Sequence, residues 1–210
     1  MKKFLLAIIV FILLLNVFIS PHNYLKRPSS TQPKNEEKKE KKEVKKRIEM
    51  EKMKKFVITV NKKFNKDAEV LIIVLTNKNI IIDSSKNFDT KFLLLSIAIK
   101  ETNVRNVVSK HGDYGYFQIK YSTVKSIQKI KEFSLPKVTE KEFLNSPEIQ
   151  IKYVICLLYY FIKKYDLDIT KENDLKVLLA MYNAGERRFK NSFSMNYASD
   201  IISYYKMLKI

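Results

Sequence analysis

The sequence predicts an all-α domain built as an orthogonal bundle of helices. From residue 44 onward, apolar residues either recur at helical spacing or fill long continuous runs. Helix start and stop signals flank most of these runs, and no segment shows the sustained alternation of a half-buried strand. A chain of 210 residues has room for one such domain with a sizeable core once its N-terminal region is set aside.

The first 20 residues predict a signal anchor or a signal peptide. The run Phe4–Ile19 is apolar except for Asn16 and is longer than the usual core of ~7–15 residues in a cleaved signal. Pro21 follows this run almost at once and makes a poor cleavage site, which favours an uncleaved anchor. We therefore expect residues 4–20 to insert into a membrane.

Residues 21–43 and 44–87 differ in character. The first segment holds three of the five prolines and then a run of Glu and Lys, so we expect a solvated, charged linker. The second begins with apolar residues at helical spacing, which predict an amphipathic helix over about 44–65 with one core-facing side. Residues 70–82 have strand propensity, but their neighbours favour a helix. The face of the 44–65 helix consists of Val44, Ile48, Met53, Val57, Val60 and Phe64.

Residues 88–210 carry the candidate chemistry, beginning with a buried helix over 92–102. This helix is apolar on nearly every side, Asp89 or Thr90 can cap its start, and Thr102-Asn103 ends it. Glu101 therefore lies in the last turn, where burial and the negative end of the helix dipole both raise its pKa. Such a carboxyl group suits a general acid, whereas a surface glutamate that only ends a helix is the plainer alternative.

Later helices follow from similar signals. Ser122-Thr123 can cap a short helix through Ile130, and Leu135-Pro136 breaks it. Pro147-Glu148 starts a strong helix over 149–165. A last pair is expected over 174–183 and 197–208.

The three glycines of the chain fall in two short strings. Gly112 and Gly115 lie in Ser-Lys-His-Gly-Asp-Tyr-Gly-Tyr-Phe-Gln (109–118), and Gly185 lies in Tyr-Asn-Ala-Gly (182–185). A helix-ending glutamate, then Ser-x-x-Gly-x-x-Gly-x-x-Gln, then Tyr-Asn-Ala-Gly resembles the soluble lytic transglycosylase (SLT) domain of the lysozyme-like superfamily, similar to glycoside hydrolase family 23. The resemblance covers about residues 88–205.

This resemblance implies a lysozyme-like fold and a peptidoglycan lytic transglycosylase. Glu101 would act as acid and then base at the bond between N-acetylmuramic acid and N-acetylglucosamine, leaving a 1,6-anhydromuramoyl end. The resemblance also implies that Ser109 and Gln118 line the groove, and that Tyr182 and Asn183 contact the reacting sugar or hold the glutamate. Tyr116 and Tyr197 are further candidates.

The chain departs from the family pattern at several positions. The interval from Glu101 to Ser109 is one residue short, Gly-Leu-Met-Gln becomes Gly-Tyr-Phe-Gln, and Gln150 and Val154 replace an asparagine and a glycine. Asp113 lies in a string similar to that of animal-type lysozymes, in which the aspartate is the second catalytic carboxylate. Asp113 would then support hydrolysis, although a turn residue between two glycines is the simpler interpretation. A catalytically silent glycan-binding or scaffold module is a third alternative.

The net charge of the chain and its metal-binding side chains limit which partners and cofactors the sequence predicts. The net charge of +18 is largely lysine, since only 5 of the 40 basic residues are arginine, and no nucleic-acid motif accompanies it. No cluster of metal ligands is evident, His111 is a solvated loop residue in this interpretation, and no cofactor is expected. The expected partners are peptidoglycan strands, the membrane and a wall-spanning secretion, flagellar or conjugation apparatus. The expected location is the cell envelope, anchored in the inner membrane with the domain on the periplasmic or extracytoplasmic side, or exported.

Overall fold

The computed structural model describes residues 32–78, 80–82 and 88–210. The chain divides into two units, Met1–Lys42 and Glu43–Ile210. Helix α2 (Gln32–Asn61) supplies all described residues of the first unit and the first element of the second. The predicted membrane segment over 4–20 lies outside the described residues, and within those residues no helix has the length and apolar character needed to cross a membrane.

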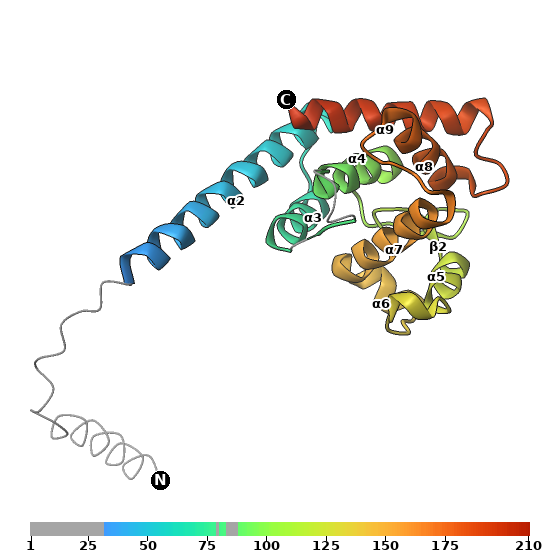
Figure 1. The fold of residues 1–210 in the computed structure, drawn as a ribbon, viewed down its shortest axis with the longest axis horizontal. Helices are drawn as coiled ribbons and strands as arrows, with labels where there is room; N and C mark the ends of the chain where they lie inside the picture. Colours follow the sequence, from blue (N-terminus) through green and yellow to red (C-terminus); the bar gives the residue numbers. More distant parts are fainter. Residues whose placement is uncertain (1–31, 79, 83–87) are drawn as a thin grey trace, which may run out of the picture. The chain divides into compact units, whose positions relative to one another are not determined.

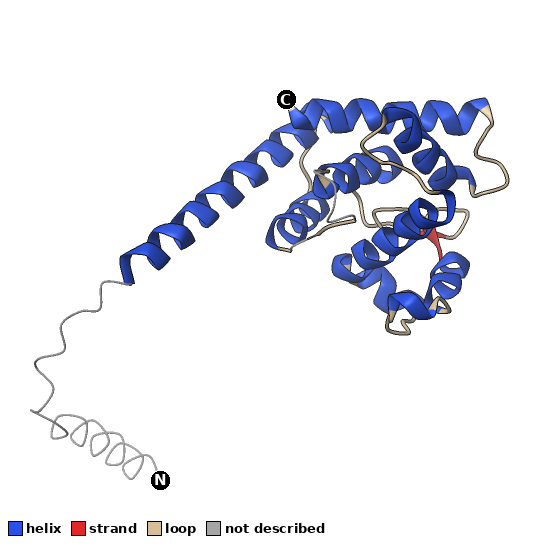
Figure 2. Cartoon of the chain, in the orientation of Figure 1, coloured by secondary structure: helices blue, strands red, loops and turns tan. Residues whose placement is uncertain are grey.

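The second unit is mostly helical, which confirms the predicted class (Figure 1). Besides helices and loops, the described residues of this unit form one short strand pair (Figure 2). The further elements are α3 (Lys66–Asn77), α4 (Thr90–Thr102), β1 (Asp113–Tyr114), β2 (Ile119–Lys120), α5 (Tyr121–Gln128), η1 (Lys131–Phe133), α6 (Glu140–Asn145), α7 (Pro147–Tyr165), α8 (Glu172–Ala184) and α9 (Ser192–Lys209).

Helix α4 forms the centre of the core, as predicted. Every side chain from Phe92 to Ile99 is buried, because α9 packs along one side of the helix and α3 lies against another. Asp89 caps its start by accepting a hydrogen bond from the backbone of Phe92 at 3.3 Å. Asn103 ends the helix in the left-handed conformation, with φ of 52°. Only the two ends of α4 reach the surface, through Lys91 in the first turn and through Lys100 and Glu101 in the last.

Helix α2 begins earlier and ends earlier than the predicted 44–65. Glu and Lys are good helix formers, and Lys41 pairs with Glu37 one turn away at 2.5 Å, so the charged run joins the helix. The predicted apolar face packs only in part. Met53 and Val57 are fully buried, but Val44 and Ile48 are 48% and 64% exposed, so their predicted core role is wrong.

Other boundaries shift by a few residues. Helix α3 covers residues 66–77, so the helix expected over 70–82 is confirmed only as far as Asn77, and the described residues 78 and 80–82 are not helical. Helix α5 starts at Tyr121 with no side-chain cap, so Ser122-Thr123 is not the cap. Helix α9 starts five residues before the predicted 197, because Asn191 caps it by accepting from the backbone of Ser194 at 2.8 Å.

The sequence analysis did not predict the β-hairpin or the two short helices η1 and α6. Strands β1 and β2 pair antiparallel with two residues each, so neither is long enough to show alternation in the sequence. Helix α6 has only six residues, although Thr139 and Glu142 form a complete capping box at its start. The hairpin follows α4 closely in the chain, and its loops supply much of the candidate site.

Candidate active site

Glu101 is the centre of the site. Its side chain is half-buried at the C-terminal end of α4, and Tyr197 of α9 donates a hydrogen bond from its hydroxyl to Glu101 Oε1. The neighbouring Lys100 points away to an ion pair with Asp200 at 2.6 Å, so it does not neutralise the glutamate directly. The sequence predicted this position for Glu101, and Tyr197 was among the further candidates.

Burial raises the pKa of Glu101 from 4.5 to about 7, and the negative charge of Asp113 adds to the rise. The hydrogen bond from Tyr197 and the charge of Lys100 act in the opposite direction. A carboxyl group with this pKa is present in both protonation states near neutral pH. It can therefore donate a proton in one step and accept one in the next.

Two tyrosines lie within electrostatic reach of this carboxyl group, and one of them, Tyr197, donates a hydrogen bond to it. Burial and the charge of Glu101 raise the pKa of Tyr197 well above its usual value. Burial and the charges of Glu101 and Asp113 do the same for Tyr182 of α8. Both phenols therefore stay protonated across the working range of pH. The Tyr182 hydroxyl donates to the carbonyl of Phe117 at 2.5 Å, so it ties α8 to the hairpin and leaves the glutamate to Tyr197.

Asn183, next to Tyr182, joins two helices. Its Oδ1 accepts a hydrogen bond from the fully buried hydroxyl of Ser194 on α9 at 3.3 Å. The structure thus brings Glu101, Tyr182 and Tyr197 together, while the oxygen of Asn183 is directed to the α8–α9 packing. Asn183 holds the end of α8, on which Tyr182 lies, against α9, on which Tyr197 lies.

Ser109 and Asp113 form a tight turn at the start of the hairpin. The Ser109 hydroxyl donates to Asp113 Oδ2 at 3.0 Å and accepts from the backbone N–H groups of His111 and Asp113 at 3.2 and 3.1 Å. Its hydrogen-bonding capacity is therefore spent on the turn. The consequence is a fixed carboxylate at Asp113, close enough to Glu101 and Tyr182 to affect the pKa of both.

Gln118 and Tyr116 stabilise the hairpin through hydrogen bonds from their side chains to backbone carbonyls. Gln118 adopts the left-handed conformation with φ of 48°, and its amide donates to the carbonyls of Gly115 and Val107 at 2.8 and 3.1 Å. Tyr116 is 1% exposed and donates to the carbonyl of Asp67 at 3.0 Å. Tyr116 therefore anchors the hairpin to α3 from within the core and presents no hydroxyl to a groove.

Gln150 of α7 is a positioning residue that was not among the site candidates. It is fully buried, accepts from the backbone of Tyr116 at 2.9 Å, and donates to Asn106 Oδ1 and the carbonyl of Leu144, each at 3.0 Å. Its amide lies against Gly115, where an added Cβ would stand 2.1 Å from Gln150 Oε1. The departure from the family asparagine at this position was the signal that could have indicated the role.

Thr102, the residue after Glu101, joins the end of α4 to the hairpin. Its hydroxyl lies 3.2 Å from the carbonyls of Ala98 and Tyr116 and accepts from the backbone of Arg105 at 3.0 Å. The residue beside Glu101 thus connects the end of α4 with the turn that carries Gly115. In the part of the chain that the structure describes, no group of three or more metal-ligating side chains occurs.

A half-buried glutamate at a helix end, which accepts a hydrogen bond from a tyrosine and feels the charge of a hairpin carboxylate, suits the acid/base chemistry that glycan-cleaving enzymes use. Residues 78–205, more than half of the chain, match the family model described as the transglycosylase SLT domain, and the chain belongs to this family of the lysozyme-like superfamily. At the level of the family, this membership implies lytic transglycosylase-type activity and binding of peptidoglycan glycans. Neither a curated protein nor a solved structure matches the chain.

Proposed function

We propose that this protein cleaves the β-1,4 bond between N-acetylmuramic acid and N-acetylglucosamine and leaves 1,6-anhydromuramoyl ends. The observation that supports this proposal most directly is the pKa of Glu101, raised to about 7 by burial. One carboxyl group with that pKa can serve both half-reactions. The SLT family match supports the substrate class.

In the first half-reaction, the protonated Glu101 donates its proton to the glycosidic oxygen. The bond from that oxygen to C1 of the muramoyl sugar breaks, and the N-acetyl carbonyl of the same sugar supports the developing positive charge. In the second half-reaction, the Glu101 carboxylate removes the proton of the 6-hydroxyl, and O6 attacks C1. Tyr197 stabilises the carboxylate between the two steps through its hydrogen bond. No water is consumed.

Asp113 supports a second candidate, a lysozyme-like hydrolase. The specific observation is that its charge raises the pKa of both Glu101 and Tyr182, so it lies within electrostatic reach of the reacting centre. In the transglycosylase, this charge helps to keep Glu101 protonated. In the hydrolase, Asp113 would activate water or stabilise the cationic sugar. The engagement of its Oδ2 by Ser109 favours the first role.

Mass spectrometry of muropeptides released from purified peptidoglycan by the full chain tests both candidates. Ends lighter by one water that disappear in Glu101→Gln support the transglycosylase, with the exposed Glu69→Gln of α3 as a matched control that keeps activity. Reducing ends that disappear in Asp113→Asn would support the hydrolase. A folded wild type that binds glycan and releases nothing would support a binding module.

We also propose that the enzyme acts in the cell envelope, held through residues 4–20 at the inner membrane with its catalytic unit on the outer side. The basis is the apolar run of this segment and the location of the substrate. A tethered enzyme of this size would be suited to open the cell wall for a secretion, flagellar or conjugation apparatus. Fractionation of cells that express the full chain, with protease access from the outside, tests the location.

A further inference from the structure

The turn that follows α4, residues 103–106, is held by side chains of α2 and α3. The side-chain amide of Asn61, the last residue of α2, donates a hydrogen bond to the carbonyl of Asn103 at 3.1 Å. The carboxylate of Asp67, in the first turn of α3, accepts from the backbone N–H of Asn106 at 3.0 Å. Two elements that come earlier in the chain therefore fix the turn at its beginning and at its end.

Both of these elements lie outside the family match. Helix α2 ends at Asn61 and α3 at Asn77, whereas the SLT match begins at residue 78. The turn that they hold begins two residues after Glu101. A part of the chain that the family match does not cover thus supports the backbone next to the catalytic glutamate.

Helix α2 contacts α4 near both ends of the latter. At the start of α4, Glu49 forms an ion pair with Lys91 at 3.1 Å. At its end, Asn61 donates to Asn103, and each of these two pairs is separated by 42 residues in sequence. The two helices therefore run in the same direction, and Met53, between the two contacts, is fully buried. These contacts fix the position of Asn61 relative to α4.

The turn has a backbone conformation that needs such support. Asn103 and Val104 both lie in the left-handed region, with φ of 52° and 58°. Asparagine adopts this region readily, but a β-branched residue such as valine rarely does. The Val104 side chain is fully buried, and its N–H donates to the carbonyl of Ala98 at 3.1 Å. Strained backbone of this kind persists where the surrounding contacts impose it, and it occurs preferentially at functional sites.

Asn61 also carries a cost that its contact with the turn can explain. Its Oδ1 is buried and has no hydrogen-bond partner among the described residues. A buried acceptor without a partner destabilises the folded state, and a leucine of similar size would avoid that cost. The advantage of asparagine here is the other half of the amide, which donates to Asn103.

Glu101 is the group that a change in this turn would affect. Burial is the largest cause of its raised pKa of about 7, although the side chain is only half-buried. A last turn of α4 that frays would admit water to the carboxyl group, so its pKa would fall toward the ordinary 4.5. Support of the turn therefore acts on the acid/base chemistry without any contact to the glutamate.

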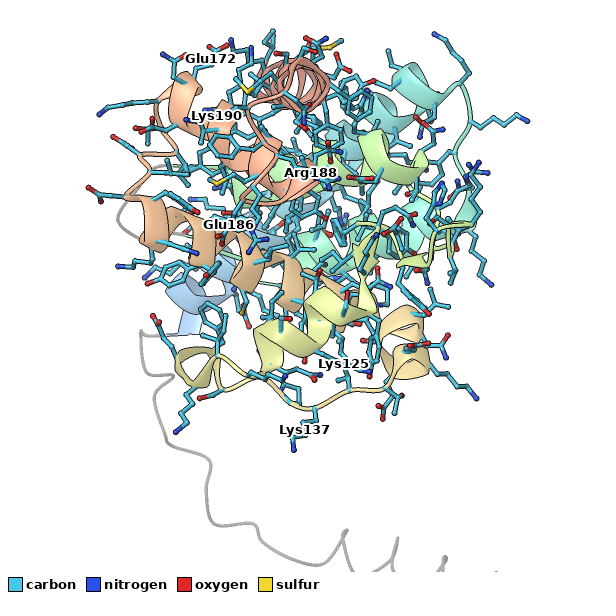
Figure 3. All side chains as sticks on the ribbon, turned by 90° about the vertical axis from the view of Figure 1, so that its right-hand side faces the viewer. Lys125, Lys137, Glu172, Glu186, Arg188 and Lys190 are labelled. Atoms are coloured by element: carbon cyan, nitrogen blue, oxygen red, sulfur yellow. The ribbon has the colours of Figure 1, made fainter. Side chains whose placement is uncertain are left out.

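The other influences on this pKa come from elsewhere. The charged and titratable groups that face Glu101 are Tyr197 of α9, Tyr182 of α8, Asp113 of the hairpin and Lys100 of α4. None of these four lies on α2 or α3, and the charge of Asp67 raises the pKa of Tyr116 instead. Charged side chains of other elements, such as Lys125 and Arg188, are exposed at the surface of the unit (Figure 3). Substitutions at Asn61 therefore leave the charges around Glu101 unchanged.

We propose that Asn61 and Asp67 are positioning residues for Glu101, and that the segment from the end of α2 to the start of α3 is part of the catalytic machinery rather than only a tether. The two side chains hold the turn after α4 and so keep the last turn of this helix closed around the carboxyl group. This inference rests on the proposed transglycosylase function for its first measurement, and its second measurement is independent of turnover.

The first measurement is the alkaline limb of kcat/KM for anhydro-end release by the full chain. Asn61→Leu removes the donor to Asn103 together with the unpaired oxygen, so the urea midpoint should change little while the limb moves by about one unit to lower pH. At pH 7 this shift lowers kcat/KM about fivefold, because the protonated fraction of Glu101 falls from about one half to about one tenth. Asp67→Ala should move the limb in the same direction.

Two control variants separate positioning from stability. Asp67→Asn keeps an oxygen that can accept from Asn106 but loses the charge that favours the start of α3. It should lower the urea midpoint slightly and leave the alkaline limb in place. Asn77→Leu makes the same change as Asn61→Leu at an exposed position of α3 and should behave as the wild type in both measurements.

The second measurement is the pH dependence of urea unfolding, which reports the pKa of Glu101 without turnover. The free energy of unfolding of each protein is compared with that of its Glu101→Gln counterpart at pH 4 and at pH 8. Because the folded-state pKa of Glu101 is raised, the counterpart gains relative stability as pH rises. This gain should be smaller in the Asn61→Leu background than in the wild-type background.

Three results would overturn the inference. The first is an Asn61→Leu protein whose alkaline limb and unfolding gain both equal those of the wild type. The second is a pair of variants, Asn61→Leu and Asp67→Ala, that lose stability with no change in either pH measurement, as residues with a purely structural role would. The third is a control variant that shifts the limb as far as Asn61→Leu does. A wild type that releases no anhydro ends would instead refute the proposed function, and the unfolding measurement would still decide the role of Asn61.

Discussion

Tyr197→Phe is expected to shift the pH profile of the enzyme upward. The Tyr197 hydroxyl donates to Glu101 Oε1 and so lowers the pKa of a carboxyl group that burial raises to about 7. A hydrogen bond to a charged group contributes about 1.5–3 kcal/mol, and one pKa unit corresponds to about 1.4 kcal/mol. Losing the bond should therefore raise the pKa of Glu101 by about one to two units.

The direction follows from the first chemical step. Free enzyme must carry a protonated Glu101, so kcat/KM falls as the pH rises through the pKa of this group. The alkaline limb of the wild type should lie near pH 7. The limb of the variant should lie at about pH 8 to 9, with a lower maximal rate because the carboxylate formed in the step has lost its donor. Anhydro-end release at limiting substrate, measured from about pH 5 to about pH 10, gives both profiles.

Tyr205→Phe is the matched control for this prediction. Tyr205 is a second buried tyrosine of α9, and its hydroxyl accepts a hydrogen bond from the backbone of Asp89 at 3.3 Å, at the opposite end of α4. Its loss should leave the alkaline limb in place. An alkaline limb in Tyr197→Phe that stays at the wild-type position, or moves to lower pH, would refute the assignment of Tyr197 as the donor that stabilises ionised Glu101.

Three further predictions concern stability, measured by urea unfolding. The folded-state pKa of Glu101 lies above the ordinary 4.5, so the stability of the wild type falls as pH rises from 4.5 to about 7. Glu101→Gln should therefore be more stable than the wild type by about 3 kcal/mol at pH 8 and by little at pH 4. An equal difference in the free energy of unfolding at both pH values would contradict this. Gly115→Ala places a Cβ 2.1 Å from Gln150 Oε1 and should cost about 2–4 kcal/mol of stability. Gly112→Ala meets no atom within 4 Å but keeps a φ of +73°, so it should cost only about 1–2 kcal/mol. Similar losses for the two variants would show that the Gln150 side chain moves aside at little cost. Tyr182→Phe leaves a hairpin carbonyl without its donor and should cost about 1–2 kcal/mol; an unchanged urea midpoint would argue against that bond.

The central helix was predictable because its signals are local. Asp89, the apolar run and Asn103 occur in one stretch, and each has a direct physical effect on where a helix starts, buries and ends. The first turns of α2 were not predictable in the same way. Val44 and Ile48 fit the helical period, but whether a helix face meets a core depends on where the rest of the chain lies. Periodicity therefore predicts a face, and tertiary contacts decide whether it is covered.

The site residues also differ in whether local signals or long-range contacts determine their positions. Glu101 was predictable from its position at the end of a buried helix. Tyr197 was placed only as a candidate, since the bond that it makes joins residues 96 positions apart in sequence. The hydroxyl of Ser109 was assigned to the groove by resemblance, yet the structure uses it within the turn that fixes Asp113. Gln150 was missed as a site residue, because a polar residue within an apolar helix shows its function only when its buried partners are known.

These long-range contacts matter for the chemistry because the pKa of Glu101 is a balance of opposed effects. Burial and Asp113 raise the pKa, and Tyr197 lowers it. Asp113 lies on the hairpin and Tyr197 on α9, so the pKa depends on how both elements sit against α4. Gln150 and Thr102 fix the hairpin side, while Asn183 and Ser194 fix the helix side. A substitution at any of these four positions should therefore alter the pH profile of catalysis as well as stability, although none of them donates a hydrogen bond to Glu101. That joint effect distinguishes a positioning residue from one that only holds the fold.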